Sequence, residues 1–129
     1  MSKILVVDDD HNAVDLFATI LRHHGHQVTA ALSGRAALDH LESDGCAPHL
    51  VILDMMMPHM NGLEVLQQIR ADARTADLQV VIFSALDDDE WRDRAVQAGA
   101  DDYWVKGSFD CGGLEEKVRS RLPAYTAPH

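Results

Sequence analysis

The chain has 129 residues, 47% of them hydrophobic, which is enough for one ordinary domain whose core needs no disulfide or metal. Its 11 basic and 21 acidic residues give a net charge of −10, which argues against direct nucleic-acid binding because phosphate contacts need lysine and arginine. No apolar run approaches the ~18 residues of a membrane span, the N-terminus turns acidic too early for a signal peptide, and the two cysteines lack metal-type spacing, so we expect a cytoplasmic protein with free thiols.

Apolar patterns along the chain predict five strands that alternate with five helices. The strands are expected at residues 4–7, 27–32, 50–54, 78–83 and 103–105, and the helices at 13–21, 33–41, 61–72, 87–98 and 114–122. Such alternation is typical of a parallel sheet with helices on both faces. Residues 1–123 are therefore expected to form one domain, and residues 124–129 to fray.

The first predicted helix carries apolar residues at helical spacing, namely Ala13, Leu16, Phe17, Ile20 and Leu21. Asp10, which precedes it, is interpreted as its N-terminal cap. His23, His24 and His26 lie at its end and in the next turn, where a solvated cluster is favoured over a metal site.

The stretch from Leu50 to Met60 suggests where the chemistry lies. Four apolar residues run directly into Asp54, as in a strand that is buried on both faces. A proline and the Asn61-Gly62 pair then turn the chain. Parallel sheets present reactive groups at the carboxyl ends of their strands. Asp54 is therefore the candidate for the reactive residue of this fold.

Polar side chains end the other predicted strands as well. The first strand ends at Asp8 and Asp9, the fourth at Ser84 and the fifth at Lys106. All carboxyl ends of a parallel sheet lie on one edge, so these side chains should meet Asp54 there. Three carboxylates held together favour a divalent cation, and oxygen ligands favour Mg²⁺. Together with a lysine and a hydroxyl they suit a phosphoryl group, which the carboxylate can attack.

The chain resembles, from about Lys3 to Leu122, the response-regulator receiver domain of two-component systems. The motifs that carry the resemblance are Val6-Val7-Asp8-Asp9, Leu53-Asp54-Met55-Met56-Met57-Pro58 with Asn61-Gly62, Ser84-Ala85, Gly99-Ala100-Asp101-Asp102-Tyr103 and Lys106. Each motif is weak alone, but the five occur in order, each at a strand end. The resemblance implies a flavodoxin-like, doubly wound, five-stranded parallel sheet of order 2-1-3-4-5 with five helices.

The resemblance also implies the chemistry of the site. Asp54 would take a phosphoryl group from a sensor histidine kinase or a histidine phosphotransfer protein. Asp9 and Asp54 would bind Mg²⁺ directly, together with the backbone carbonyl of Met56, and Asp8 would act through water. The protein would be no enzyme beyond its own phosphorylation and a slow autodephosphorylation.

A switch is implied at the neighbouring strand ends. Ser84 would move toward the phosphoryl group, Lys106 would pair with it, and Tyr103 would change rotamer with Ser84. A downstream effector would bind the face formed by the fourth helix, fifth strand and fifth helix, and pairing of two copies stays open. Trp91 and Trp104 are either core residues or part of that face.

Three features depart from the family pattern. Glycine follows Lys106 in place of proline, and the cis form costs ~2.5–4 kcal/mol without proline, so we predict a trans Lys106–Gly107 bond. Met56 and Leu86 are apolar where some members carry polar groups, which predicts slow loss of the phosphoryl group because nothing there holds a water. No output domain follows, which suggests a stand-alone or excised receiver.

Three other interpretations remain. A haloacid-dehalogenase-type phosphatase also uses a strand-end aspartate and Mg²⁺, but it needs a second acid where this chain has Met56. A flavin carrier needs a phosphate-cradling loop after the first strand, where the aspartates at 8–10 would repel a phosphate. A degenerate receiver that only binds partners is disfavoured by the intact set of Asp8, Asp9, Asp54, Ser84 and Lys106.

Overall fold

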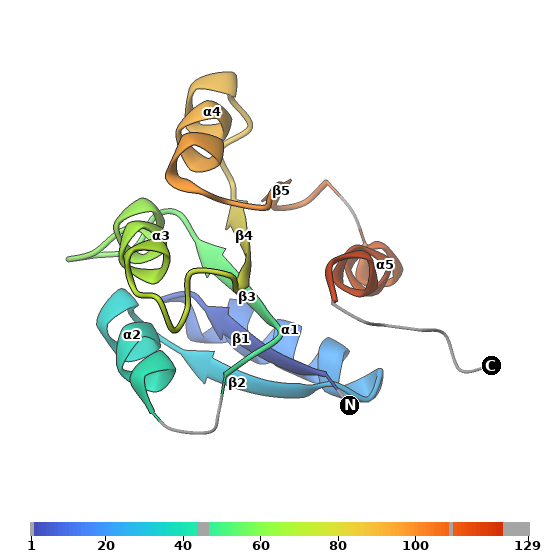
Figure 1. Cartoon of the computed structure of the whole chain (residues 1–129). Coiled ribbons are helices and arrows are strands. Elements are labelled where there is room, and N and C mark those ends of the chain that lie inside the picture. Colours follow the sequence, from blue (N-terminus) through green and yellow to red (C-terminus); the bar gives the residue numbers. More distant parts are fainter. Residues whose placement is uncertain (1, 44–46, 109, 123–129) are drawn as a thin grey trace.

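The computed structural model describes residues 2–43, 47–108 and 110–122, so the expected fraying of residues 124–129 lies outside the described part. Five strands and five helices alternate in it, as predicted (Figure 1). Their bounds are β1 Lys3–Val7, α1 His11–His23, β2 Gln27–Ala31, α2 Gly34–Glu42, β3 Leu50–Asp54, α3 Gly62–Ala71, β4 Gln79–Ser84, α4 Asp89–Ala98, β5 Asp102–Val105 and α5 Cys111–Arg121.

The strands form one parallel sheet of order β2-β1-β3-β4-β5, which confirms the predicted topology. All five residues of β3 are buried, as expected for a central strand covered on both faces. The register pairs Val7 with Leu53 and Asp54 with Phe83. The ends of β1, β3 and β4 are therefore level, and the residues that follow them share one edge.

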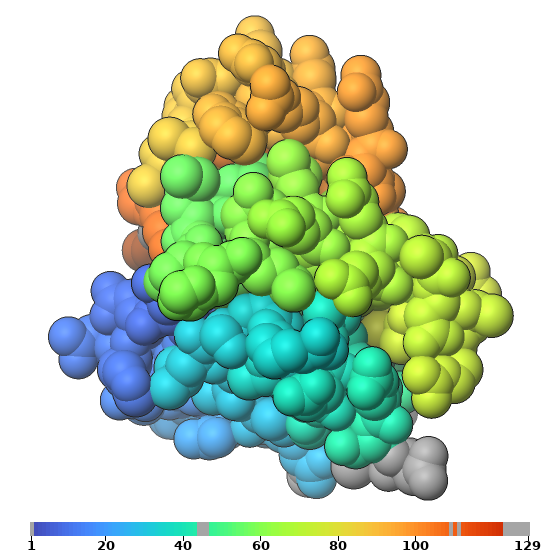
Figure 2. All heavy atoms as spheres, turned by 90° about the vertical axis from the view of Figure 1, so that its left-hand side faces the viewer, coloured from blue at the N-terminus to red at the C-terminus, as the bar shows by residue number. Residues whose placement is uncertain are grey.

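Two apolar cores lie on the two faces of the sheet. Successive strand residues point to opposite faces, so Val51 and Leu53 join α2, α3 and α4 in one core, while Leu50 and Ile52 join α1 and α5 in the other. Figure 1 shows α5 across the sheet from α2, α3 and α4. Figure 2 looks onto that three-helix layer, with α4 above α3 and α2 below.

The buried stripe of α1 differs from the full apolar pattern in the sequence. Val14, Ala18 and Leu21 are buried, whereas Leu16 is 56% exposed. At 3.6 residues per turn a helix presents Val14, Ala18 and Leu21 on one line. Leu16 lies almost opposite that line, at the far edge of a second stripe that also contains Ala13, Phe17 and Ile20. That stripe borders an open groove of about 290 Å³ between α1 and Leu114 of α5.

Residues in two turns bear out one prediction and contradict another. Asp10 caps α1, and its Oδ1 accepts a hydrogen bond from the backbone N–H of Asn12 at 2.9 Å. His23 and His24 are exposed, as predicted, but His26 is not, since its side chain is only 9% exposed and its Nε2 lies 3.2 Å from Oε2 of Glu115. That partner comes from α5, which packs against the α1–β2 turn, so local sequence could not reveal it.

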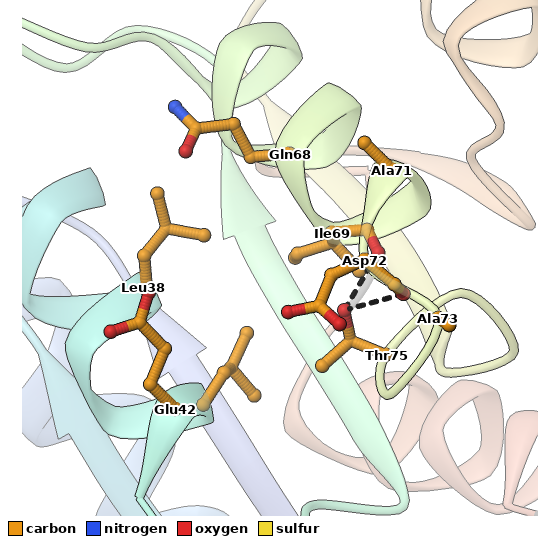
Figure 3. Close-up of a pocket in the computed structure, with 9 residues that line it drawn as sticks. Leu38, Glu42, Gln68, Ile69, Ala71, Asp72, Ala73 and Thr75 are labelled. Carbon is orange, nitrogen blue, oxygen red and sulfur yellow. Dashed lines mark hydrogen bonds between the residues drawn. The ribbon is translucent and has the colours of Figure 1, made fainter.

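A pocket of about 500 Å³ opens between α2 and α3 (Figure 3). Leu38 and Ile69 give it apolar walls, and Glu42, Gln68 and Asp72 give it polar ones. It lies where both helices end, and helices in such a sheet end beside the amino ends of the strands. The pocket is therefore at the edge opposite Asp54.

No helix of the described ranges is long and apolar enough to cross a membrane.

Candidate functional site

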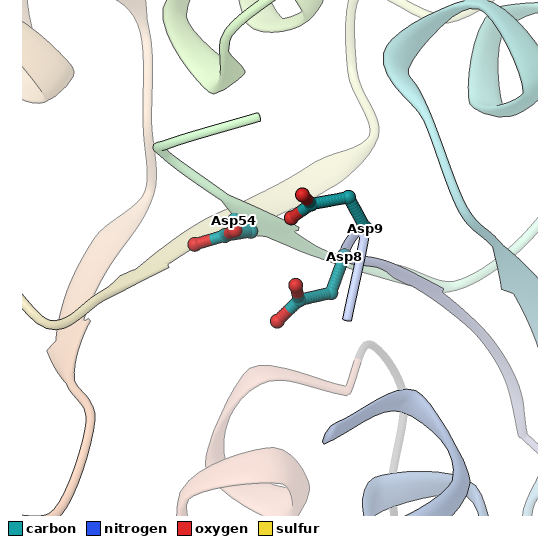
Figure 4. Close-up of side chains that lie close together, drawn as sticks. All are labelled: Asp8, Asp9 and Asp54. Carbon is teal, nitrogen blue, oxygen red and sulfur yellow. The ribbon is translucent and has the colours of Figure 1, made fainter. Parts of the chain in front are cut away.

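Three carboxylates meet at the carboxyl edge of the sheet, as the sequence predicts (Figure 4). Asp8 and Asp9 follow β1, Asp54 ends β3, and one oxygen of each lies within 4.8 Å of the others. Asp8 and Asp54 are buried, whereas Asp9 is exposed and leaves the cluster open to solvent. Carboxylate oxygens alone suit a hard divalent cation, so the donor set fits Mg²⁺.

Lys106 brings a cation to the two buried carboxylates. Its Nζ lies 3.0 Å from Oδ2 of Asp8 and 3.3 Å from Oδ1 of Asp54. The Lys106–Gly107 bond is trans, as predicted, and Gly107 adopts a φ of +83° that favours glycine. The glycine lets the β5–α5 turn aim the lysine at the carboxylates without a proline.

The site is short of positive charge. Burial, and then the negative charge of Asp8, raise the pKa of Asp54 from 3.8 to about 6, against the opposing pull of Lys106. Burial alone would lower the pKa of Lys106, but its hydrogen bond to Asp8 and the charges of Asp54 and Asp8 raise it. Lys106 therefore stays charged, while ionised Asp54 is held in an unfavourable environment that an added cation would relieve.

The β3–α3 loop fixes the position of Asp54 through the backbone. The N–H of Gly62 donates to the carbonyl of Met55 at 2.9 Å. The start of α3 then lies so close to β3 that a Cβ on Gly62 would overlap the carbonyl oxygen of Asp54. Met56 turns outward from this loop, and its side chain is 56% exposed. The predicted role of its carbonyl as a metal ligand stays a prediction.

Ser84 and Tyr103 are joined through one residue. Ser84 is fully buried at the end of β4, and its Oγ accepts a hydrogen bond from the N–H of Leu86 at 3.0 Å. Tyr103 is 5% exposed, and its hydroxyl donates to the carbonyl of Leu86 at 2.6 Å. The sequence pattern pointed only to the apolar side chain of Leu86. The link made by its backbone had no signal in the sequence.

The two tryptophans differ in position. Trp104 is buried in the core that faces α1 and α5, and its Nε1 donates to Oδ2 of Asp102 at 3.0 Å. Trp91 is half-buried on α4 against the opposite core. Trp104 is thus a core residue, and Trp91 lies at the border of core and surface.

A comparison with protein families identifies the family of this chain. The model of the response regulator receiver domain matches residues 4–119. The chain therefore belongs to the response-regulator receiver domains of two-component signal transduction. Members of this family interact with histidine kinases, and they bind Mg²⁺ in general.

Individual relatives agree. The response regulator MprA of Mycolicibacterium vanbaalenii is 41% identical over 124 residues, which are 96% of this chain and 52% of that protein. The regulator RpaA of Synechocystis is 35% identical over 125 residues, 95% of this chain and 49% of its own. The structure of the response regulator TrrA from Thermotoga maritima, in complex with Mg²⁺-BeF, superposes with a TM-score of 0.81 at 36% identity, covering 95% of this chain and all of that one.

The chain spans about half the length of these curated relatives. RpaA is by name a DNA-binding transcriptional regulator. The expectation that this protein has no direct contact with nucleic acid rested on its acidic composition, and the comparisons do not support it.

Proposed function

We propose that Asp54 is the phosphoryl acceptor of this receiver domain and that its donor is a histidine kinase or a histidine phosphotransfer protein. The observation that carries the proposal is the buried Asp54 carboxylate, which lies beside two other acids with Lys106 at 3.3 Å. The chain then works as a stoichiometric switch in a phosphorelay rather than as an enzyme with turnover. The absence of an acid at position 56 speaks against the dehalogenase-type phosphatase.

The transfer step uses groups of this site. A carboxylate oxygen of Asp54 attacks phosphorus, the P–N bond to the donor histidine breaks, and its electron pair returns to the imidazole. Lys106 supplies positive charge toward the phosphoryl oxygens, and Ser84 supplies a hydroxyl once it moves inward. Asp9, Asp54 and the Met56 carbonyl would hold Mg²⁺ directly, and Asp8 would act on it through water. When bound, the ion would supply positive charge that lowers the repulsion between the carboxylate and the phosphoryl group.

The test is intact-mass measurement after incubation with acetyl phosphate and Mg²⁺. We expect one phosphoryl adduct on the native chain and none on Asp54→Ala. Asp10→Asn is the matched control, because Asp10 is an exposed acid beside the cluster whose capping role asparagine keeps. An adduct that persists in Asp54→Ala would refute the assignment, and phosphate release without any adduct would favour a phosphatase.

The apolar residues beside the site should make the phosphoryl group long-lived. Replacing the exposed Met56 with Asn, or Leu86 with Glu, offers a polar group that can hold the attacking water. We expect either change to speed dephosphorylation by up to about a hundredfold, the low end of what a positioned acid or base contributes. Leu16→Asn is the control, since Leu16 is equally exposed but lies on α1. Unchanged decay of the adduct in both variants would mean that another feature sets its lifetime.

The output is proposed on the face made by α4, β5 and α5. Tyr103 lies on β5, and Val96 of α4 is 60% exposed there. An effector, a second copy of the chain or an attached domain would bind this face. We also propose that the protein works in the cytoplasm.

A further inference from the structure

Arg92, on the first turn of α4, covers the ring of Tyr103. Its guanidinium carbon lies 5.1 Å from the ring centroid, a cation–π distance. The same guanidinium donates through Nη2 to Oδ1 of Asp87 at 3.2 Å. Asp87 precedes Asp88, which caps α4. One side chain thus joins the beginning of the helix to the ring on β5.

Two contacts hold the Tyr103 side chain, one at its hydroxyl and one at the face of its ring. Its hydroxyl is bonded to the Leu86 carbonyl at 2.6 Å, and its ring face is closed by Arg92. An outward rotamer would break both contacts. The Arg92 side chain is 42% exposed, so its cation–π contact with the ring is only moderately strong. A contact of this strength changes the ratio of buried to exposed Tyr103 rotamers by about two- to fivefold.

The contacts form a continuous path from the site to α4. Ser84 binds the N–H of Leu86, Tyr103 binds its carbonyl, and Arg92 covers Tyr103. A movement of Ser84 would therefore act on the loop residue to which the tyrosine is bonded. The contact with Arg92 favours the buried position of the ring, the rotamer in which the contact is seen.

We propose that Arg92 is a positioning residue that holds Tyr103 in its buried rotamer and couples that rotamer to the start of α4. Its use in signalling rests on the proposed function, but its hold on the ring does not. Asp87 takes part by orienting the guanidinium, since it is the acid whose hydrogen bond to Arg92 is seen.

The helix supplies a matched control. Arg94 lies 5.0 Å over the ring of Trp91 and pairs with Glu90 at 3.1 Å, so it has the same chemistry but a different ring. Arg92→Gln and Arg94→Gln each remove one charge, one cation–π contact and one ion pair from α4. Arg92→Lys keeps the charge but loses the planar group.

The test observes Tyr103 directly. Tyr125→Phe leaves Tyr103 as the only tyrosine of the chain, and fluorotyrosine incorporated there reports solvent contact by ¹⁹F NMR. We expect Arg92→Gln to raise the exposed population about two- to fivefold, Arg92→Lys to restore part of the buried state, and Arg94→Gln to leave it unchanged. Urea unfolding of each variant separates a local effect from general destabilisation.

An unchanged exposed population in Arg92→Gln, or an equal rise in Arg94→Gln, would overturn the proposal. These spectra need no phosphoryl donor. Failure of the proposed function would appear instead as a missing adduct in the mass measurement, and the two failures are therefore distinguishable.

Discussion

Asp54→Asn is expected to raise the free energy of unfolding at pH 7, without Mg²⁺, by up to about 3 kcal/mol. The pKa of this buried carboxyl is raised from 3.8 to about 6, and each pH unit corresponds to about 1.36 kcal/mol. The ionised carboxylate therefore destabilises the folded chain. Asparagine has the same shape without the charge, and it leaves the pair of Asp8 and Lys106 intact.

The pH dependence of this difference follows from the direction of the pKa shift. A carboxyl with a raised native pKa stabilises the fold fully below pH 3.8, where it is protonated, and loses that contribution as the pH rises to about 6. The native chain and Asp54→Asn should thus be nearly equal in stability at pH 3.5 and diverge up to about pH 6. Urea unfolding across this range measures it, with Asp10→Asn as the exposed-acid control. A difference that stays constant with pH would exclude the raised pKa as its cause.

Mg²⁺ is expected to stabilise the native chain. A ligand that binds only the folded state at a hundredfold excess over its Kd adds about 2.7 kcal/mol. The clustered oxygens of Asp8, Asp9 and Asp54 provide the site, and the added charge relieves the cost of ionising Asp54. Mg²⁺ should therefore cancel most of the advantage of Asp54→Asn, which has lost a ligand.

Thermal melting with MgCl₂, against NaCl of equal ionic strength, checks this. Asp9→Asn is the informative variant, because Asp9 is exposed and its replacement leaves the core untouched. We expect it to lose most of the Mg²⁺-dependent shift in Tm. A shift of native size in Asp9→Asn would place the ion elsewhere.

Much of the fold and the convergence of the site could be predicted because strand ends in a parallel sheet share an edge. That rule alone predicted that Asp8, Asp54 and Lys106 meet, and the structure places Nζ of the lysine 3.0 Å from Asp8 and 3.3 Å from Asp54. The trans bond before Gly107 followed from the intrinsic cost of the cis form. These predictions depend on local patterns and backbone geometry.

Features that depend on packing between distant elements could not be predicted. The contact of His26 with Glu115 joins positions 89 residues apart in the chain. The rotamer of Tyr103 depends on a carbonyl in the β4–α4 loop and on an arginine of α4. Helical spacing and residue type contain no information on such partners.

The packing of Gly62 against β3 bears on how natural variants of this domain should be sorted. A variant that kept every acid and the lysine, but carried alanine at position 62, would look intact when its charges alone are inspected. Its new methyl group would overlap the Asp54 carbonyl, so the strand end or the helix start would have to shift. Such a chain could lose its reactive geometry while its charge pattern stayed unchanged. This glycine therefore belongs with the aspartates as a marker of a working acceptor.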